Sequence, residues 1–552
     1  MVKFDGAKFA RYLKYDEMVA LLQEVAADHP NLTKLYSIGQ THEGRDLWMM
    51  EVTNRLAGDP NHKPGFYIDG NIHAGEVTGS AVCLYTIGYL TSLYGDDRWV
   101  TELVDRVTFY ILPRISADGA ELFLTTPHVL RSSTRLYPGD ESEGGVTPGD
   151  VDADGHILQM RIEDPDGEWK VYHKDPRLMV RRRPDDTEGK FYTILPEGIV
   201  EDYDGVEIKF KPSKWGLDIN RNFPAHWEPE AVQRGAGPFP LSEPETKAVA
   251  DFLVAHPNIG GVMAYHTTAG AILRPLCTGD DGKMNPKDLA AYRAIGELGE
   301  ELTGYPCISV YEGFTSGAPL KGVFMDWVYE HLGAIVYSTE LWDAAARAGM
   351  PRVFGKAARR TDEDGYKLLQ WNDRELAGKG FEPWRPFDHP QLGPVEIGGW
   401  RSKFVLVNPP EPFLEGECRK NMLFTLKHAA ALPQLEILEL RAEAVASQLY
   451  KITAVVTNRG YLPSNITEMA KTIKKAKPVV AELSLAEGAR LVHGKAREEL
   501  GHLEGRLSLG GYSPPNPRKK KVEWLVQAPS GTRVSLAVSS PRAGRASAEV
   551  VL

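Results

Sequence analysis

The sequence predicts an α/β protein whose mixed, mostly parallel sheet is flanked by helices and is followed by a C-terminal all-β sandwich. The α/β part is indicated by short apolar segments that end in polar or glycine turns and lead into helix-like patterns, at 106–115, 260–266 and 333–341. Apolar residues at helical spacing, as in 287–302, alternate with these segments, which is typical of strands buried between two helical layers. We therefore expect one large α/β domain over residues 1–433.

The C-terminal region has a different pattern. Residues 450–465 and 522–540 contain short alternating strands, separated by turns rich in Asn, Gly, Pro and Ser. The length and rhythm of this pattern are typical of a β-sandwich, which we expect over residues 434–552.

The α/β pattern is interrupted between about 136 and 215. This stretch is acidic and dense in turns, with strand-like segments at 156–162 and 168–173. We interpret it as an insertion of hairpins and loops at the rim of the sheet, without a core of its own.

Composition narrows the function classes. The chain has 552 residues, a formal net charge of -11, 42% hydrophobic residues and 25% charged residues, as expected for a soluble protein of more than one domain. The acidic balance argues against a nucleic-acid partner, and the basic runs at 181–183 and 518–521 are interpreted as solvated loop charges.

The four cysteines form no CxxC pair, and the chain shows neither a leader-like start nor a long apolar run. We expect a cytoplasmic protein without membrane contact, with removal of a leader from a precursor left open.

Potential metal ligands lie where predicted strands end. His73 and Glu76 follow the strand-like segment that begins at Tyr67, and His266 ends another. A lone His-x-x-Glu pair is weak evidence, but a catalytic zinc site needs only three protein ligands and leaves one position for water. Glu340, at a further strand end, is placed to move a proton. Asp118 also follows a strand, and such strand ends converge at one edge of a parallel sheet.

Several segments follow one another in an order that carries a family resemblance: YIDGNIHAGE (67–76), LDINRNF (217–223), GPFPLSEPETKAV (237–249), AYHT (264–267) and TELWD (339–343). Together with the opening helix and strand at 12–52, they resemble the zinc carboxypeptidase family of the carboxypeptidase A and B type. The resemblance spans roughly residues 10 to 345 and extends towards about 430.

The resemblance implies one zinc ion per chain, bound by His73, Glu76 and His266. It also implies that Asp218 orients a ligand histidine and that Glu340 is the general base and acid acting on the water at the zinc. Two further residues, Asn220 and Arg221, match the pair that grips the free C-terminal carboxylate of the substrate, for which the planar fork of an arginine is well suited.

Looser matches imply further roles. Arg131 lies thirteen residues after Asp118, the spacing of the arginine that stabilises the oxyanion; Arg135 is an alternative, and 181–183 are more distant ones. Tyr311 matches the tyrosine that caps the substrate, although the loop from it to the Asp326–Trp327 pair is longer than in the family.

Two positions bear on substrate choice. Met325 matches the residue that lines the specificity pocket, which implies apolar C-terminal residues, although the longer loop puts its register in doubt. Gly75 stands where the family usually has a basic residue, so contacts with the substrate differ there.

A second cation site is one interpretation of an acidic loop. Asp150, Asp152 and Asp154 alternate before Gly155, which suits calcium, but Arg161 stands where an EF-hand would have its glutamate. A solvated hairpin turn explains the same pattern, and the sequence leaves both open.

The first functional hypothesis is a zinc metallocarboxypeptidase that hydrolyses the C-terminal bond of peptides with a free carboxylate. A zinc amidohydrolase on the same scaffold, acting on N-acyl amino acids or peptidoglycan-derived peptides, is an alternative. A catalytically inactive binding protein is another, and the oligomeric state is left open.

Overall fold

The computed structural model describes residues 4–137, 144–355, 360–507 and 518–552. Its largest sheet has the strand order β1-β2-β4-β3-β11-β14-β12-β13. The four central strands β4, β3, β11 and β14 run parallel, as predicted, and the outer strands add antiparallel pairs. The strands of this main sheet are β1 (Thr33–Gln40), β2 (Asp46–Val52), β3 (Gly65–Gly70), β4 (Thr108–Leu112), β11 (Ile259–Thr267), β12 (Ala271–Arg274), β13 (Cys307–Ser309) and β14 (Ile335–Leu341).

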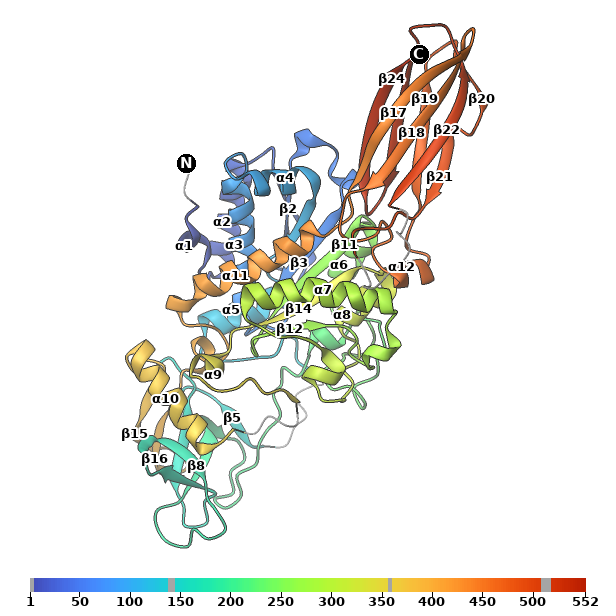
Figure 1. Ribbon diagram of the computed structural model, residues 1–552. Helices are drawn as coiled ribbons and strands as arrows, with labels where there is room; N and C mark the ends of the chain where they lie inside the picture. The colour runs from blue at the N-terminus through green and yellow to red at the C-terminus, as the bar shows by residue number, and fades with distance from the viewer. Residues whose placement is uncertain (1–3, 138–143, 356–359, 508–517) are drawn as a thin grey trace.

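Helices cover both faces of the main sheet (Figure 1). The alternation along β3 shows this, because Phe66 packs against His428 of one helix while Tyr67 packs against Phe252 of another, on the opposite face. Among the described residues, none of the helices combines the length and the apolar character that crossing a membrane requires. The helices are α1 (Gly6–Phe9), α2 (Tyr15–Asp28), α3 (Thr78–Leu93), α4 (Arg98–Arg106), α5 (Ala117–Thr125), α6 (Pro244–Ala255), α7 (Pro286–Thr303), α8 (Phe324–Trp327), α9 (Ala344–Arg347), α10 (Asp362–Leu376), α11 (Glu411–Ala430) and α12 (Glu468–Thr472).

The insertion builds a second sheet, which we call the accessory sheet, with the order β15-β16-β6-β9-β7-β8. Four of its strands come from the insertion and two from residues far downstream. A small hydrophobic cluster that includes Met160, Leu195 and Ile397 packs against it. The insertion therefore adds to a small core that it shares with the downstream strands and does not form alone. The strands are β6 (Gln159–Glu163), β7 (Trp169–Tyr172), β8 (Asp175–Arg181), β9 (Tyr192–Pro196), β15 (Phe381–His389) and β16 (Gly393–Trp400), with a separate pair β5 (Val146–Pro148) and β10 (Gly198–Val200).

The C-terminal region forms two four-stranded antiparallel sheets, β17-β18-β22-β20 and β21-β19-β23-β24, around a common apolar cluster. Trp524 is the largest side chain of this cluster, and its ring is almost wholly buried. The strands are β17 (Leu435–Ala446), β18 (Leu449–Asn458), β19 (Val479–Leu485), β20 (Arg490–His493), β21 (Arg497–Gly501), β22 (Lys519–Gln527), β23 (Arg533–Ser540) and β24 (Gly544–Val551).

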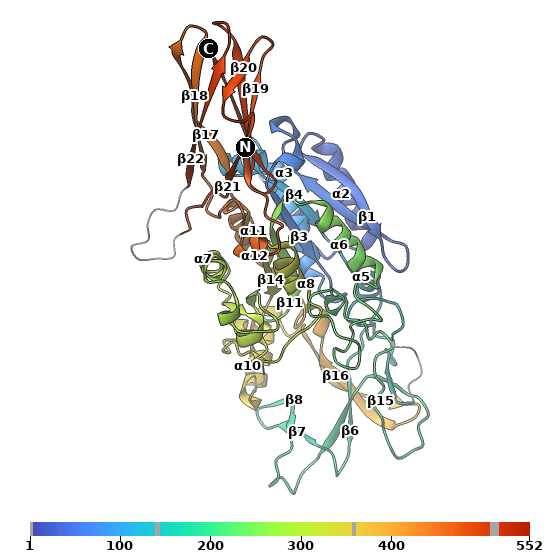
Figure 2. The same ribbon diagram turned by 90° about the vertical axis from the view of Figure 1, so that its right-hand side faces the viewer.

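The sandwich and the accessory sheet lie at opposite ends of the α/β domain, as both views show (Figures 1 and 2). The sandwich docks where β14 begins: Arg542 donates to the carbonyls of Leu332 (2.6 Å) and Gly333 (2.9 Å). Thr467 donates to the same Gly333 carbonyl at 2.8 Å. These contacts fix the sandwich at the amino ends of the central strands, away from the ends where ligands bind in such folds.

Candidate metal centre

The loop between β3 and α3 carries two of the predicted ligands. Its two ends approach so closely that a side chain on Gly70 would meet the backbone of Gly79 at 2.5 Å. Asn71 adopts a left-handed conformation, with φ of 61°, and its amide donates to the carbonyls of His73 (2.6 Å) and Ala74 (3.1 Å). This tight closure turns His73 to the same side as Glu76, which follows in the same loop.

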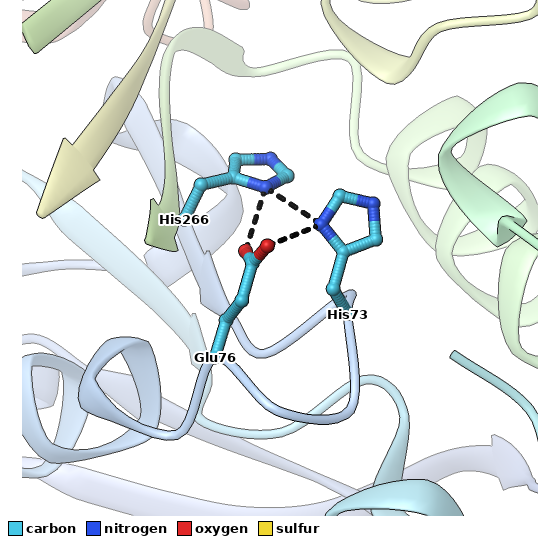
Figure 3. Close-up of side chains that lie close together, drawn as sticks. All are labelled: His73, Glu76 and His266. Atoms are coloured by element: carbon cyan, nitrogen blue, oxygen red, sulfur yellow. Dashed lines mark hydrogen bonds and ion pairs between the residues drawn. The ribbon is translucent and has the colours of Figure 1, made fainter. Parts of the chain in front are cut away.

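Three donor side chains meet at this loop (Figure 3). His73 Nδ1 lies 2.9 Å from Glu76 Oε1, His266 Nδ1 lies 3.0 Å from Glu76 Oε2, and the two Nδ1 atoms are 3.2 Å apart. Neighbouring ligands of a tetrahedral zinc ion with bonds near 2.0 Å are separated by roughly 3.3 Å. All three side chains are buried, and the described residues place these donors within one small volume.

The chemistry of these donors fits a dication. Two imidazole nitrogens that face each other and one carboxylate offer lone pairs to a single point, and these repel one another unless a proton or a metal lies between them. Burial raises the pKa of Glu76, but the charges and hydrogen bonds of His73 and His266 outweigh it and hold the pKa below its ordinary value. The backbone N–H of Thr267 also donates to Glu76 Oε2, at 3.1 Å. The residues present therefore fit zinc, and these three would hold it.

Asp218 orients the first histidine. Its Oδ1 lies 3.0 Å from His73 Nε2, which leaves Nδ1 free to face the metal position. Burial alone would raise the pKa of Asp218, but the charges of Arg221 and Arg131 hold it well below its usual range. The carboxylate therefore stays ionised and fixes the tautomer of His73.

Arg131 lies at the metal centre, and its alternatives do not. Arg131 Nε donates to Asp218 at 3.0 Å, and its Nη1 donates to Glu76 at 3.3 Å. Arg135 instead pairs with the buried Glu243. The more distant run at 181–183 belongs to the accessory sheet, where Arg181 and Arg182 stack on aromatic rings. Among these candidate arginines, Arg131 is the one whose described contacts include a metal ligand, Glu76.

Asn220 and Arg221 follow Asp218 in a short 3₁₀ turn. The Arg221 side chain is 13% exposed, lies 3.8 Å from Asp218 Oδ2, and donates to the carbonyl of Asn220 at 2.7 Å. Asn220 Oδ1 accepts from the N–H of Phe324 at 3.0 Å. An arginine held beside the ligand shell is well placed to receive a carboxylate.

Glu340 lies level with a metal ligand across the sheet. In the parallel pairing of β11 with β14, His266 is opposite Glu340. Burial raises the pKa of Glu340 to about 7, against the lowering effect of the His266 charge. A carboxyl that titrates near neutrality can both accept and return a proton, whereas an ordinary glutamate is a weak acid donor there. A bound dication would draw this pKa downwards.

Three other expectations have different outcomes. The grouping of Asp118 with the strand-end ligands is wrong, because its carboxylate accepts from Thr41 and Arg45 and fastens that loop instead. Met325 is 2% exposed and lies in the main core. Tyr311 is held through its backbone, with its N–H bonded to Leu276. The roles of Met325 and Tyr311 in substrate binding stay predictions.

Asn71 is a functional residue that the sequence analysis missed. Its signal was present, since a polar residue directly after a strand-end glycine is typical of a left-handed turn position. The side-chain bonds that close the ligand loop depend on the fold and have no sequence signal of their own.

The family comparison decides the assignment. The zinc carboxypeptidase family model matches residues 18–360, which include every predicted zinc ligand. The chain belongs to the zinc carboxypeptidase family. A second family model, a domain of unknown function (DUF8731), matches residues 434–551, the region of the sandwich.

Individual proteins match the chain only in part. The chain is 34% identical over 118 residues to a zinc carboxypeptidase of Saccharothrix mutabilis subsp. capreolus, which covers 21% of this chain and 27% of that protein. It is 31% identical over 357 residues to human carboxypeptidase B, covering 62% of this chain and 66% of that protein. Thrombin activatable fibrinolysis inhibitor has a structure similar at a TM-score of 0.46, with 18% identity, over 77% of this chain and 76% of that one. The first of these relatives is thus matched over only about a quarter of its length.

Proposed function

We propose that this zinc carboxypeptidase family member is a zinc-dependent metallocarboxypeptidase that hydrolyses the C-terminal bond of peptides. The observation that carries the proposal is the joining of the three-donor site to Arg221 through Asp218, within one buried cluster. A metal beside a carboxylate-binding arginine suits a substrate whose scissile bond lies one residue from a free carboxylate.

Zinc, when bound by His73, Glu76 and His266, supplies Lewis-acid chemistry that acidifies water and polarises a carbonyl. The residues of the chain perform the rest. Arg221 and Asn220 hold the terminal carboxylate, and Arg131 donates to the oxygen that becomes negative. Glu340 takes the proton of the attacking water and passes it to the leaving amine.

Preference for apolar C-terminal residues is the finer part of the proposal. It is supported by the methionine at position 325, which lies between the buried residues Phe324 and Asp326. Asp326 is 1% exposed and its carboxylate already accepts from the N–H of Cys277, at 2.9 and 3.0 Å, so it is a poor partner for a basic substrate side chain. We therefore expect release of apolar residues before basic ones.

One observation favours small substrates and therefore supports the alternative function, a zinc amidohydrolase. The accessory-sheet strands of the insertion arise between Arg131 and Asp218, two residues that contact each other at the metal centre. Both ends of the insertion therefore lie beside the metal centre, a position from which its loops would restrict long peptides under this alternative.

Calcium does not enter the proposal. Asp152 and Asp154 both form ion pairs with Arg385 of β15, and Asp150 accepts backbone N–H groups of Asp154 and Gly155. Arg385 therefore already supplies positive charge to these carboxylates, as a calcium ion would.

The test compares matched substrates with the purified, zinc-loaded chain. N-acyl derivatives of Leu, Phe and Arg, and N-acyl dipeptides and octapeptides ending in the same residues, would each be offered with a free C-terminal carboxylate and as the C-terminal amide. We expect release of Leu and Phe from the free acids of both lengths, and no release from the amides. Hydrolysis of N-acyl amino acids alone would establish the amidohydrolase instead. Zinc binding without hydrolysis of any of these would contradict both.

A further inference from the structure

A buried asparagine from outside the matched family segment contacts the ligand loop. Asn408 lies after the accessory-sheet strand β16 and before α11, and it has no exposed surface. Its Oδ1 accepts from the N–H of Thr78 at 3.1 Å and from the hydroxyl of the same residue at 2.7 Å. Its Nδ2 donates to the carbonyl of Gly75 at 2.7 Å and to that of Lys403 at 2.9 Å. Four hydrogen bonds satisfy the whole amide.

The positions of these contacts matter more than their number. Gly75 directly precedes the ligand Glu76, and Thr78 begins α3 two residues after it. Asn408 therefore holds the backbone on both sides of one zinc ligand. Asn71 holds the other part of the loop from within, through the carbonyls of His73 and Ala74.

The segment that carries Asn408, residues 401–410, is itself anchored beside the metal centre. Lys403 Nζ donates to the carbonyls of Phe123 (2.7 Å) and Thr126 (2.6 Å), at the end of the helix that leads to Arg131. The hydroxyl of Tyr12 donates to the carbonyl of Pro409 at 2.6 Å. The segment is thus bonded both to the ligand loop and to the end of α5, the helix that precedes Arg131.

We propose that Asn408 is a positioning residue for the zinc centre, which fixes the backbone around Glu76 so that its carboxylate meets His73 and His266 at one point. This inference rests on the proposed function for its zinc and its chemistry. Without the amide, the Gly75 carbonyl and the Thr78 N–H lose buried partners, and the loop gains freedom at the ligand it must hold. Groups that support metal ligands in this way change metal affinity by about 10- to 100-fold when they are lost.

The experiment compares Asn408→Ala with a matched control, Asn458→Ala. Asn458 is 2% exposed and also makes four hydrogen bonds, to Gln434, Gly460, Leu462 and Glu504, but at the end of strand β18 in the sandwich. Zinc affinity is measured by competition with a chelator, and the Tm is measured with and without zinc. The absorption spectrum of the cobalt(II)-substituted proteins and the kcat and KM for a free-acid dipeptide complete the comparison.

We expect both variants to lower the Tm of the metal-free protein. Only Asn408→Ala should weaken zinc binding, by about 10- to 100-fold, change the cobalt spectrum and lower kcat more than KM. Equal zinc affinity in Asn408→Ala and the wild type would overturn the proposal, whatever the loss in Tm.

A milder variant serves if Asn408→Ala does not fold. Thr78→Val keeps the shape of the side chain and removes the 2.7 Å hydroxyl bond. It should weaken zinc binding in the same direction, by about threefold or more, and unchanged affinity would overturn the proposal.

If the wild type binds zinc but cleaves no peptide, the proposed function fails alone and the zinc affinities still decide the role of Asn408. If the wild type binds no zinc, both fail.

Discussion

The two ends of the central strands are built in opposite ways. At the carboxyl ends of β11 and β14, His266 and Glu340 lie side by side, and the pKa of Glu340 is raised to about 7 by burial. At the amino end of β14, the carbonyls of Leu332 and Gly333 accept from Arg542 of the sandwich. The first edge gathers ionisable groups in a small volume, and the second pairs its polar groups with a docked domain.

The difference shows where the fold places costly groups. The burial of several carboxylates and histidines at one edge lowers stability unless a metal or a counter-charge balances them. The hydrogen-bonded docking edge and the apolar core supply stability that this edge does not. We therefore expect substitutions at the carboxyl edge to change activity and those at the amino edge to change stability.

The largest expected effect is at the carboxyl edge. Glu340→Gln keeps the shape of the side chain but removes the proton acceptor, so kcat should fall about 10³-fold or more. Zinc content and Tm should stay at or above wild-type values, because an uncharged group replaces a buried carboxyl whose burial is unfavourable. A fall in Tm of several degrees would show that this edge also stabilises the fold.

Arg221→Gln should have the next largest effect. Loss of the charge-assisted bonds to a substrate carboxylate should reduce kcat/KM about 100-fold for free-acid peptides. The exposed Arg234 offers a control, and Arg234→Gln should leave kcat/KM unchanged. An equal loss in both variants would mean that long-range charge, not a specific site, attracts the substrate.

At the amino edge, Arg542→Met should lower the free energy of unfolding by about 2 kcal/mol, because three backbone carbonyls lose a buried donor. Its kcat/KM should stay within twofold of the wild type. Arg533→Met, at a largely exposed position of the sandwich, is the control and should have little effect on unfolding. A tenfold change in kcat/KM for Arg542→Met would contradict the view that the amino edge affects stability and not activity.

The metal ligands at the carboxyl edge were easier to predict from the sequence than the loops that surround them. His73, Glu76 and His266 occur in short segments that each end a strand, so donor type, order and strand position are all visible in the sequence. The same logic was wrong for Asp118, which also ends a strand, because its side chain turns towards Thr41 and Arg45. A strand-end position predicts which edge a residue occupies, and the packing of neighbouring loops decides where its side chain points.

The accessory sheet could not be predicted from local pattern. Its strand β6 pairs with β16, where Met160 is opposite Ile397, so the pairing joins segments more than 200 residues apart. The predicted strands at 156–162 and 168–173 do exist, but their partners and their core depend on contacts that no local periodicity records. Asn408 was missed for the same reason.

The smallest expected effect appears only in acid. His428 of α11 is fully buried against Phe66 and Tyr337, and both its ring nitrogens lack a hydrogen-bond partner among the described residues. Burial lowers its pKa to about 3, below the value of about 6.5 in an unfolded chain.

Between these two pKa values the unfolded state binds one more proton at this site than the folded state, so stability falls as the pH drops below about 6.5. At pH 5.5 the loss from this group should be about 1.3 kcal/mol relative to pH 7.0, and His428→Phe should remove it. Unfolding in urea at pH 7.0 and 5.5 measures the difference. Phe424→Leu, a packing change in the same helix, should lower stability equally at both pH values. If the wild type and His428→Phe lose the same stability in acid, the protons are taken up elsewhere, and the carboxyl edge, with its histidine ligands, becomes the place to look.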